Sequence, residues 1–199
     1  MNVINSFDFA ILEFWHKIAE NTDNFFKPII DIISFLGEKG WFFILLSFVL
    51  IAFKKTRKIG FISLGALCFG VLFTNITLKP LIGRLRPFEF SDVYNEWWIY
   101  AGKVAESGFS FPSGHVTATM ASMFAIFLNT NKKKSWPLLI VIILMGISRN
   151  YLMVHYPSDV VGAMISGGCA ALISSFIVKK VYACEKLKKI KFIKNILGE

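Results

Sequence analysis

The chain has 199 residues, of which 55% are hydrophobic and 18% charged, and its mean hydropathy is +0.58. This composition excludes an ordinary soluble domain and predicts one integral membrane domain over residues 1–199. The formal net charge is +9, but the Lys and Arg residues cluster beside apolar runs, which indicates membrane topology rather than a nucleic-acid partner. Three cysteines without close spacing argue against a disulfide framework or a zinc site.

The N-terminal segment, residues 1–36, has an amphipathic pattern. Within residues 4–20, four polar side chains interrupt the apolar face: Asp8, Glu13, His16 and Lys17. We interpret this stretch as a helix that lies at the membrane interface rather than a span, and residues 28–36 continue the pattern.

Five apolar runs predict membrane-spanning helices. They are residues 41–53, 59–78, 116–128, 136–147 (extending to about 154) and 160–178. The first covers only about 20 Å as a helix, so it must borrow residues before Trp41 or cross with little tilt. In the last run, Gly162 and Ser166 provide a small-residue packing face, or reflect mere tolerance of small side chains. The predicted fold is an all-α polytopic transmembrane helix bundle with five clear spans and an N-terminal amphipathic or sixth helix.

Basic clusters set the expected orientation. Lysines and arginines occupy residues 54–58 and 132–134, and residues 179–199 form a basic tail. Alternating spans place all three clusters on one side, which is cytoplasmic by the positive-inside rule, together with the C-terminus. The tail is either a helix on anionic lipid or a solvated charged segment. The long polar and aromatic loop at 79–112 and the turn at 148–159 then lie on the extracytoplasmic side.

Three polar segments, at residues 79–87, 111–115 and 148–159, fall at the extracytoplasmic ends of spans. They bring Lys79, Arg86 and Arg149 to a membrane boundary, where fixed charges are costly and mark function. Three cations suit a phosphoryl group, and Arg adds bidentate hydrogen bonding. Because no metal-ligand cluster lies nearby, we expect these cations to act in place of a metal ion, with no cofactor.

The second segment contains the sequence Pro112-Ser113-Gly114-His115. If Pro112 is the first helical residue, Ser113 and Gly114 offer free N–H groups at a helix N-terminus, which favours an anion. Glycine also lets the backbone approach the phosphate closely. His115 follows at a position from which it could protonate a leaving oxygen.

The third segment repeats this arrangement, with Pro157 as the expected first residue of the last span. Asp159 then lies in the first turn and can reach back toward His155. A carboxylate on one imidazole nitrogen fixes the tautomer and frees the other nitrogen to attack. This predicts a two-step displacement through a phosphohistidine. Taken singly, each charged residue also fits a membrane-interface anchor, and we interpret Arg84 in that way.

These segments resemble the type 2 phosphatidic acid phosphatase (PAP2) superfamily. The family pattern is Lys, six residues, Arg-Pro; then Pro-Ser-Gly-His; then Ser-Arg, five residues, His, three residues, Asp. Every element and both internal spacings recur in this chain. The resemblance implies a six-helix core, with His155 as nucleophile, Asp159 as its partner and His115 as general acid. It also implies metal-free phosphate binding by Lys79, Arg86, Ser113, Gly114 and Arg149.

Related enzymes share the pattern, which leaves alternatives for the activity. Vanadium haloperoxidases look similar at the site but are soluble, and glucose-6-phosphatase-like enzymes act on a soluble sugar phosphate. Here several aromatic residues crowd the 79–112 loop, where they either guide a lipid chain or form a simple aromatic belt: Phe88, Phe90, Trp97, Trp98, Tyr100 and Phe109.

The leading hypothesis is a bacterial inner-membrane lipid phosphatase. Undecaprenyl diphosphate, phosphatidylglycerol phosphate, phosphatidic acid and lipid A phosphates all remain open as substrates. The alternatives are a lipid phosphotransferase that uses the same intermediate and a non-catalytic membrane protein. The pattern makes no prediction of the oligomeric state.

Overall fold

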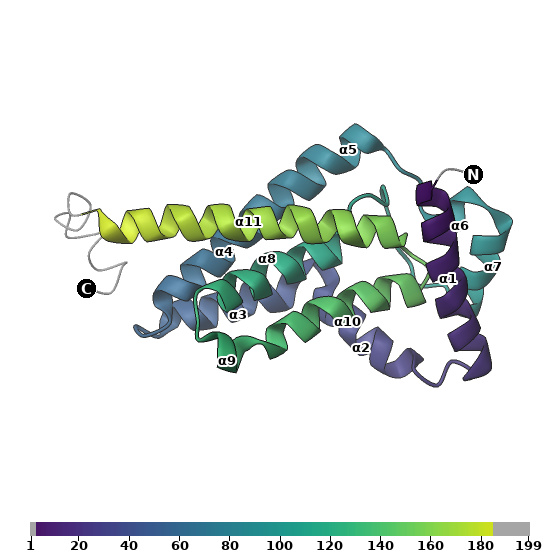
Figure 1. The fold of residues 1–199 in the computed structure, drawn as a ribbon, viewed down its shortest axis with the longest axis horizontal. Helices are drawn as coiled ribbons and strands as arrows, with labels where there is room; N and C mark the ends of the chain where they lie inside the picture. The colour runs from purple at the N-terminus through teal and green to yellow at the C-terminus, as the bar shows by residue number, and fades with distance from the viewer. Residues whose placement is uncertain (1–2, 185–199) are drawn as a thin grey trace.

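Long helices with roughly aligned axes and alternating chain direction form the body of the molecule (Figure 1). The computed structural model describes residues 3–184. The stretches of the bundle are α2 (Lys27–Gly37) continued through η1 (Glu38–Gly40) into α3 (Trp41–Ala52), α4 (Arg57–Val71) continued into η2 (Leu72–Leu78) and α5 (Lys79–Ile82), α8 (Gly114–Leu128), α10 (Pro137–Tyr151) and α11 (Pro157–Ala183). α11 packs mainly against α8 and α4. The predicted all-α membrane bundle is confirmed for the described residues.

Three helical stretches within residues 3–184 are long and apolar enough to cross a membrane: Lys27–Ala52, Arg57–Phe90 and Pro157–Ala183. α8 is apolar but shorter. The short predicted run at 41–53 is part of a longer stretch that includes α2, which was one of the two possibilities that its length left open. The chain bends between α2 and α3, where Lys39 and Gly40 adopt left-handed conformations with φ of 49° and 69°. The number of spans stays a prediction.

α1 (Val3–Asn21) lies across one end of the bundle and contacts α10 and α11 (Figure 1). α6 (Pro87–Phe90) and α7 (Asp92–Tyr100) lie at the same end, so the predicted 79–112 loop contains short helices. The rings of Phe88 and Trp98 stack 4.3 Å apart, and His16 of α1 stacks on Trp97 at 4.8 Å. Both tryptophans therefore pack in the layer that covers this end of the bundle.

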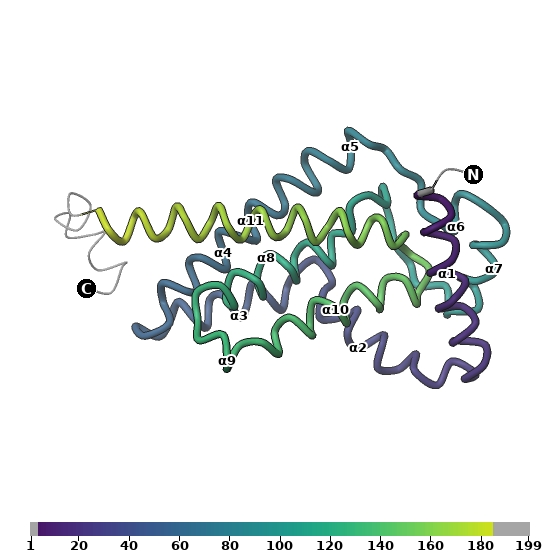
Figure 2. The backbone as a smooth tube through the Cα atoms, in the orientation of Figure 1, coloured from purple at the N-terminus to yellow at the C-terminus, as the bar shows by residue number. Residues whose placement is uncertain are grey.

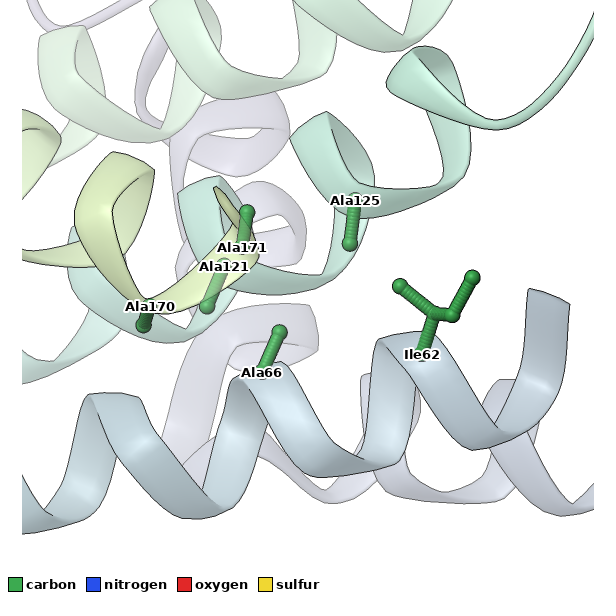
Figure 3. Packing of buried hydrophobic residues seen from close by; sticks show 6 residues of the cluster. All are labelled: Ile62, Ala66, Ala121, Ala125, Ala170 and Ala171. Carbon is green, nitrogen blue, oxygen red and sulfur yellow. The ribbon is translucent and has the colours of Figure 1, made fainter. Parts of the chain in front are cut away.

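Small residues allow close approach of α4, α8 and α11. Figure 3 shows the buried cluster formed by Ile62, Ala66, Ala121, Ala125, Ala170 and Ala171. The predicted small-residue face of α11 also lies against neighbours: a Cβ added to Gly162 would be 2.5 Å from the Phe111 ring, and Ser166 Oγ lies 3.4 Å from the hydroxyls of Thr74 and Thr117. Van der Waals contact and such polar contacts are what hold helices together in lipid.

The two ends of the bundle differ in chemistry. Figure 2 shows the α3–α4 turn, α9 (Lys132–Ser135) and the end of α11 at one end, opposite α1 and the α10–α11 turn. The basic clusters at 54–58 and 132–134 therefore share one end, and the three polar segments share the other. Of the predicted basic tail at 179–199, the helix continues to Ala183, and residues 185–199 lie outside the described part of the chain.

Candidate active site

A cavity of about 470 Å³ opens where the three polar segments meet. Five of the predicted site residues line it: Lys79, Arg86, Gly114, His115 and His155. Lys79 directly follows η2, a π-helical segment, and Thr74 and Asn75 of that segment also line the cavity. π-helical turns frequently occur at functional sites because they reorient the side chains that follow.

His155 and Asp159 are both buried, and Ser110 lies between them. Asp159 Oδ2 is 3.6 Å from His155 Nδ1, which is longer than a hydrogen bond. Ser110 Oγ donates to Asp159 Oδ2 at 2.5 Å and lies 3.4 Å from His155 Nδ1. The two residues lie side by side, and Ser110 is an additional partner of both that the sequence reasoning missed.

The first turn of α11 positions Asp159 as expected. α11 begins at Pro157, and Asp159 Oδ2 accepts a hydrogen bond from the Tyr156 backbone N–H at 2.9 Å. The capping interaction therefore reaches Tyr156 rather than His155 itself. The backbone carbonyl of His155 accepts from the Asn150 side-chain amide at 3.0 Å, which fixes the turn that carries the imidazole.

Burial lowers the pKa of His155 to about 4, against the opposing effect of the Asp159 carboxylate. The imidazole is therefore neutral at pH 7. With Asp159 and Ser110 beside Nδ1, the favoured tautomer carries its proton there, which leaves the Nε2 lone pair available. Nε2 lies 3.4 Å from Arg86 Nη1, so it faces one of the cations that line the cavity.

Arg86 is almost fully buried and organises the loop that precedes α8. Its Nε donates to the Gly108 carbonyl at 3.0 Å, and Nη2 donates to the Ser107 carbonyl at 2.9 Å. Nη1 donates to the Val154 carbonyl at 3.0 Å, next to His155. The guanidinium thus joins the 106–110 loop to the turn that carries the candidate nucleophile.

The Glu106 carboxylate is the anion that pairs with two cations of the site and lies near His115. Arg149 Nη1 donates to its Oε1 at 3.0 Å, Arg86 Nη2 donates to its Oε2 at 3.3 Å, and His115 Nδ1 lies 3.8 Å from Oε1. Arg149 also donates to Ser34 Oγ at 2.8 Å through Nη2. The sequence analysis missed this role, because one acidic residue in a loop of mixed charge carries no spacing signal.

The start of α8 differs from the prediction. Ser113 has the extended ψ of 118° typical of an N-cap residue, so the helix begins at Gly114, and Pro112 lies outside it. The Ser113 N–H is not free, because it donates to the Asp159 carbonyl at 3.3 Å. The buried Ser113 Oγ has no hydrogen-bond partner among residues 3–184 and is the group that remains available.

Arg84 is not the membrane anchor that the sequence predicted. Its Nη1 donates to Asp159 Oδ1 at 2.6 Å, and its Nη2 donates to Asp8 Oδ2 at 2.6 Å. Two buried carboxylates therefore draw the guanidinium inward. Asp8, predicted as a polar interruption of α1, is only 1% exposed.

Comparisons with known proteins identify the family of the chain. The PAP2 superfamily model matches residues 59–182. The chain is 28% identical to an undecaprenyl-diphosphatase of Sulfolobus acidocaldarius over 80% of this chain and 73% of the relative. It is 29% identical to a lipid A 4'-phosphatase of Bacteroides thetaiotaomicron over 90% of this chain and 80% of the relative.

The fold matches a solved structure of similar size. A crystal structure of a transmembrane PAP2-type phosphatidylglycerolphosphate phosphatase from Bacillus subtilis superposes with a TM-score of 0.67 and 28% identity, covering 96% of this chain and 90% of that chain. The family match covers more than half of the chain, and these relatives are phosphatases. The chain therefore belongs to the PAP2 superfamily and is a membrane enzyme of the phosphatase class.

Proposed function

We propose that the protein hydrolyses a membrane lipid phosphate or diphosphate through a phosphohistidine formed on His155. The observation that carries this proposal is the convergence of two imidazoles, Lys79 and Arg86 in the lining of one cavity, with Arg149 paired to the lining residue Glu106. Glu106 marks the anion position, since its carboxylate contacts Arg86 and Arg149 and lies near His115. A phosphoryl group placed there faces the cations that its equatorial oxygens require.

In the first step, His155 Nε2 attacks phosphorus, an N–P bond forms and the bond from phosphorus to the lipid oxygen breaks. His115 gives its proton to the leaving oxygen, so the lipid departs as an alcohol or a lipid monophosphate. In the second step, water attacks the phosphohistidine while His115 takes a proton from it. The N–P bond breaks, inorganic phosphate leaves and both imidazoles return to their starting states.

Asp159 orients the nucleophile, and the cations stabilise the transferring group. The carboxylate beside Nδ1 stabilises the charge that the ring acquires on phosphorylation. Arg86, Arg149 and Lys79 neutralise the equatorial oxygens, so we propose that the reaction needs no metal ion. Ser113 Oγ and the backbone at Gly114, at the N-terminus of α8, provide further donors.

The proposed substrate class follows from the membrane setting and the relatives. The named relatives act on undecaprenyl diphosphate, lipid A and phosphatidylglycerol phosphate, all of which carry phosphate on a lipid anchor. We place the site at the extracytoplasmic face of a bacterial inner membrane, because the basic clusters at 54–58 and 132–134 lie at the opposite bundle end.

Release of inorganic phosphate from detergent-solubilised protein tests the proposal. The substrates are undecaprenyl diphosphate, phosphatidylglycerol phosphate, phosphatidic acid and lipid A, with glucose 6-phosphate as the soluble comparison. We expect hydrolysis of at least one lipid, unchanged by a chelator, and its loss in His155→Ala. His16→Gln is the matched control, since His16 lies in α1 outside the cavity lining. Retained turnover in His155→Ala would reject the assignment.

A further inference from the structure

A carboxylate of α1 reaches the catalytic end of α11, although α1 lies outside the stretch that the family model matches. Asp8 Oδ1 accepts from the Ser158 backbone N–H at 2.8 Å, and Oδ2 accepts from Ser158 Oγ at 2.7 Å. Ser158 is the second residue of α11 and immediately precedes Asp159. Asp8 thus binds the helix turn that carries the partner of the candidate nucleophile.

Arg84 joins this carboxylate to Asp159. One arm of its guanidinium donates to Asp159 Oδ1 and Ser158 Oγ at 2.6 and 2.7 Å, and the other donates to Asp8 Oδ2 at 2.6 Å. The planar group lies 3.8 Å from the centre of the Tyr156 ring. Only the forked geometry of Arg bridges two carboxylates and stacks on a ring at once.

The two carboxylates are buried, so the bridge has an energetic role as well as a geometric one. Asp8 and Asp159 are 1% and 0% exposed. A buried charge is strongly destabilising unless it is paired and hydrogen-bonded. With Oδ1 of Asp159 fixed by Arg84, its Oδ2 is left for Ser110, Tyr156 N–H and the His155 ring.

We propose that Asp8 and Arg84 are positioning residues of the phosphatase, which hold Asp159 in the orientation that keeps the His155 ring aligned for attack. This inference rests on the proposed function of His155. It makes α1 a working part of the active site rather than a membrane anchor alone. Asp8 and Arg84 act on the chemical step through Asp159 and do not contact the phosphate-binding cations. Their loss should therefore lower kcat and leave KM unchanged.

The test compares Arg84→Gln, Arg84→Lys and Asp8→Asn on the same lipid phosphate. Loss of a partner that orients a metal-ligating histidine costs about 10- to 100-fold, and by analogy we expect kcat to fall by about that factor with KM essentially unchanged. Arg84→Lys keeps the charge without the fork and should recover part of the loss. Glu13→Gln is the matched control, because Glu13 lies on α1 in an exposed pair with Lys17.

The pH profile separates positioning from a general loss of structure. The titratable and charged groups around His155 are Asp159, Arg86, Arg149 and His115, with Arg84 and Asp8 behind Asp159. Removing the Arg84 cation favours the imidazolium and should move the acid limb of kcat/KM to higher pH. Removing the Asp8 anion should move that limb to lower pH. A structural role alone would not shift the two limbs in opposite directions.

The outcomes separate this inference from the proposed function. Lower kcat with oppositely shifted limbs supports it. The positioning role is overturned if Arg84→Gln and Asp8→Asn both keep the wild-type kcat while His155→Ala is inactive. It is also overturned if their activity falls but the acid limbs do not move. Turnover in His155→Ala overturns the proposed function instead. If Asp8→Asn does not yield a monodisperse protein, Arg84→Gln and Arg84→Lys decide the question by the limb shift and the partial recovery.

Discussion

Glu106 shows how single residues set the resting state of the site. Its carboxylate contacts Arg86 and Arg149, so on the proposed function it competes with phosphate for these two cations. Glu106→Gln removes this competing charge. If the binding free energy of phosphate changes by about 1 kcal/mol, its affinity changes roughly fivefold. We expect inorganic phosphate to inhibit the variant roughly fivefold more tightly in a competitive inhibition assay. Glu96→Gln, on the exposed part of α7, is the control, and unchanged or weaker inhibition would contradict this reading.

The ionisation of His155 gives a second prediction at this scale. Burial lowers its pKa to about 4, and only the neutral ring can attack phosphorus. Activity is therefore present above that pKa and is lost as the pH falls through it. We expect kcat/KM, corrected for substrate ionisation, to decline only below about pH 4. A decline that begins near pH 6.5, the pKa of an unperturbed imidazole, would show that the ring is not desolvated in this way.

Residue types and spacings predicted the motif residues but not their supporting contacts. His155 with Asp159, and Lys79 with Arg86, stand out because costly polar groups recur at the ends of apolar runs. Asp8 meets Ser158 only through packing of α1 on the start of α11, which no local pattern records. Arg84 looked like an interface anchor for the same reason, since its two carboxylate partners are distant in sequence.

Two adjacent glycines of α11 test the helix packing. A Cβ on Gly167 would lie 2.8 Å from the Thr117 carbonyl oxygen and from Met120 Cβ, whereas one on Gly168 would meet only the flexible Met120 Cε at 3.3 Å. Overpacking against backbone costs about 1–3 kcal/mol. We expect Gly167→Ala to lower the thermal midpoint in detergent by several degrees and Gly168→Ala to leave it unchanged or raised. Equal midpoints for the two variants would contradict this packing.

The start of a helix was predictable where one residue type determined it. Pro157 starts α11 as expected, because proline has no N–H to lose at a first helical turn. The same argument was wrong for Pro112, because Ser113 takes the N-cap position between the proline and the helix. The helices in the 79–112 loop were missed because they are short and depend on packing against α1, as the stacking of His16 on Trp97 illustrates.

The whole molecule places the candidate site at one end of the bundle and the basic clusters at the other. This separation predicts opposite accessibility for α7 and the α3–α4 turn. In a chain whose native cysteines are replaced by serine, we expect Glu96→Cys to react with a membrane-impermeant maleimide in intact cells. Lys55→Cys, which is also exposed, should react only after lysis. The reverse pattern would place the site on the cytoplasmic side.

Alternating spans made this end-to-end arrangement predictable, because each apolar run reverses the side of the next loop. The cavity at the site end was not predictable, since its lining includes the bend between α2 and α3 and the π-helical turn of η2. The lining residues also come from segments far apart in the sequence, from Ser34 to His155.

The stereochemical course at phosphorus tests the two-step reaction most directly. Each in-line displacement inverts the configuration, so a phosphohistidine followed by attack of water gives overall retention. With a lipid phosphate made chiral by sulfur and two oxygen isotopes, and hydrolysed in water that carries the third isotope, we expect inorganic thiophosphate of retained configuration. Inversion would mean that water attacks the lipid phosphate directly, and that His155 is not the nucleophile.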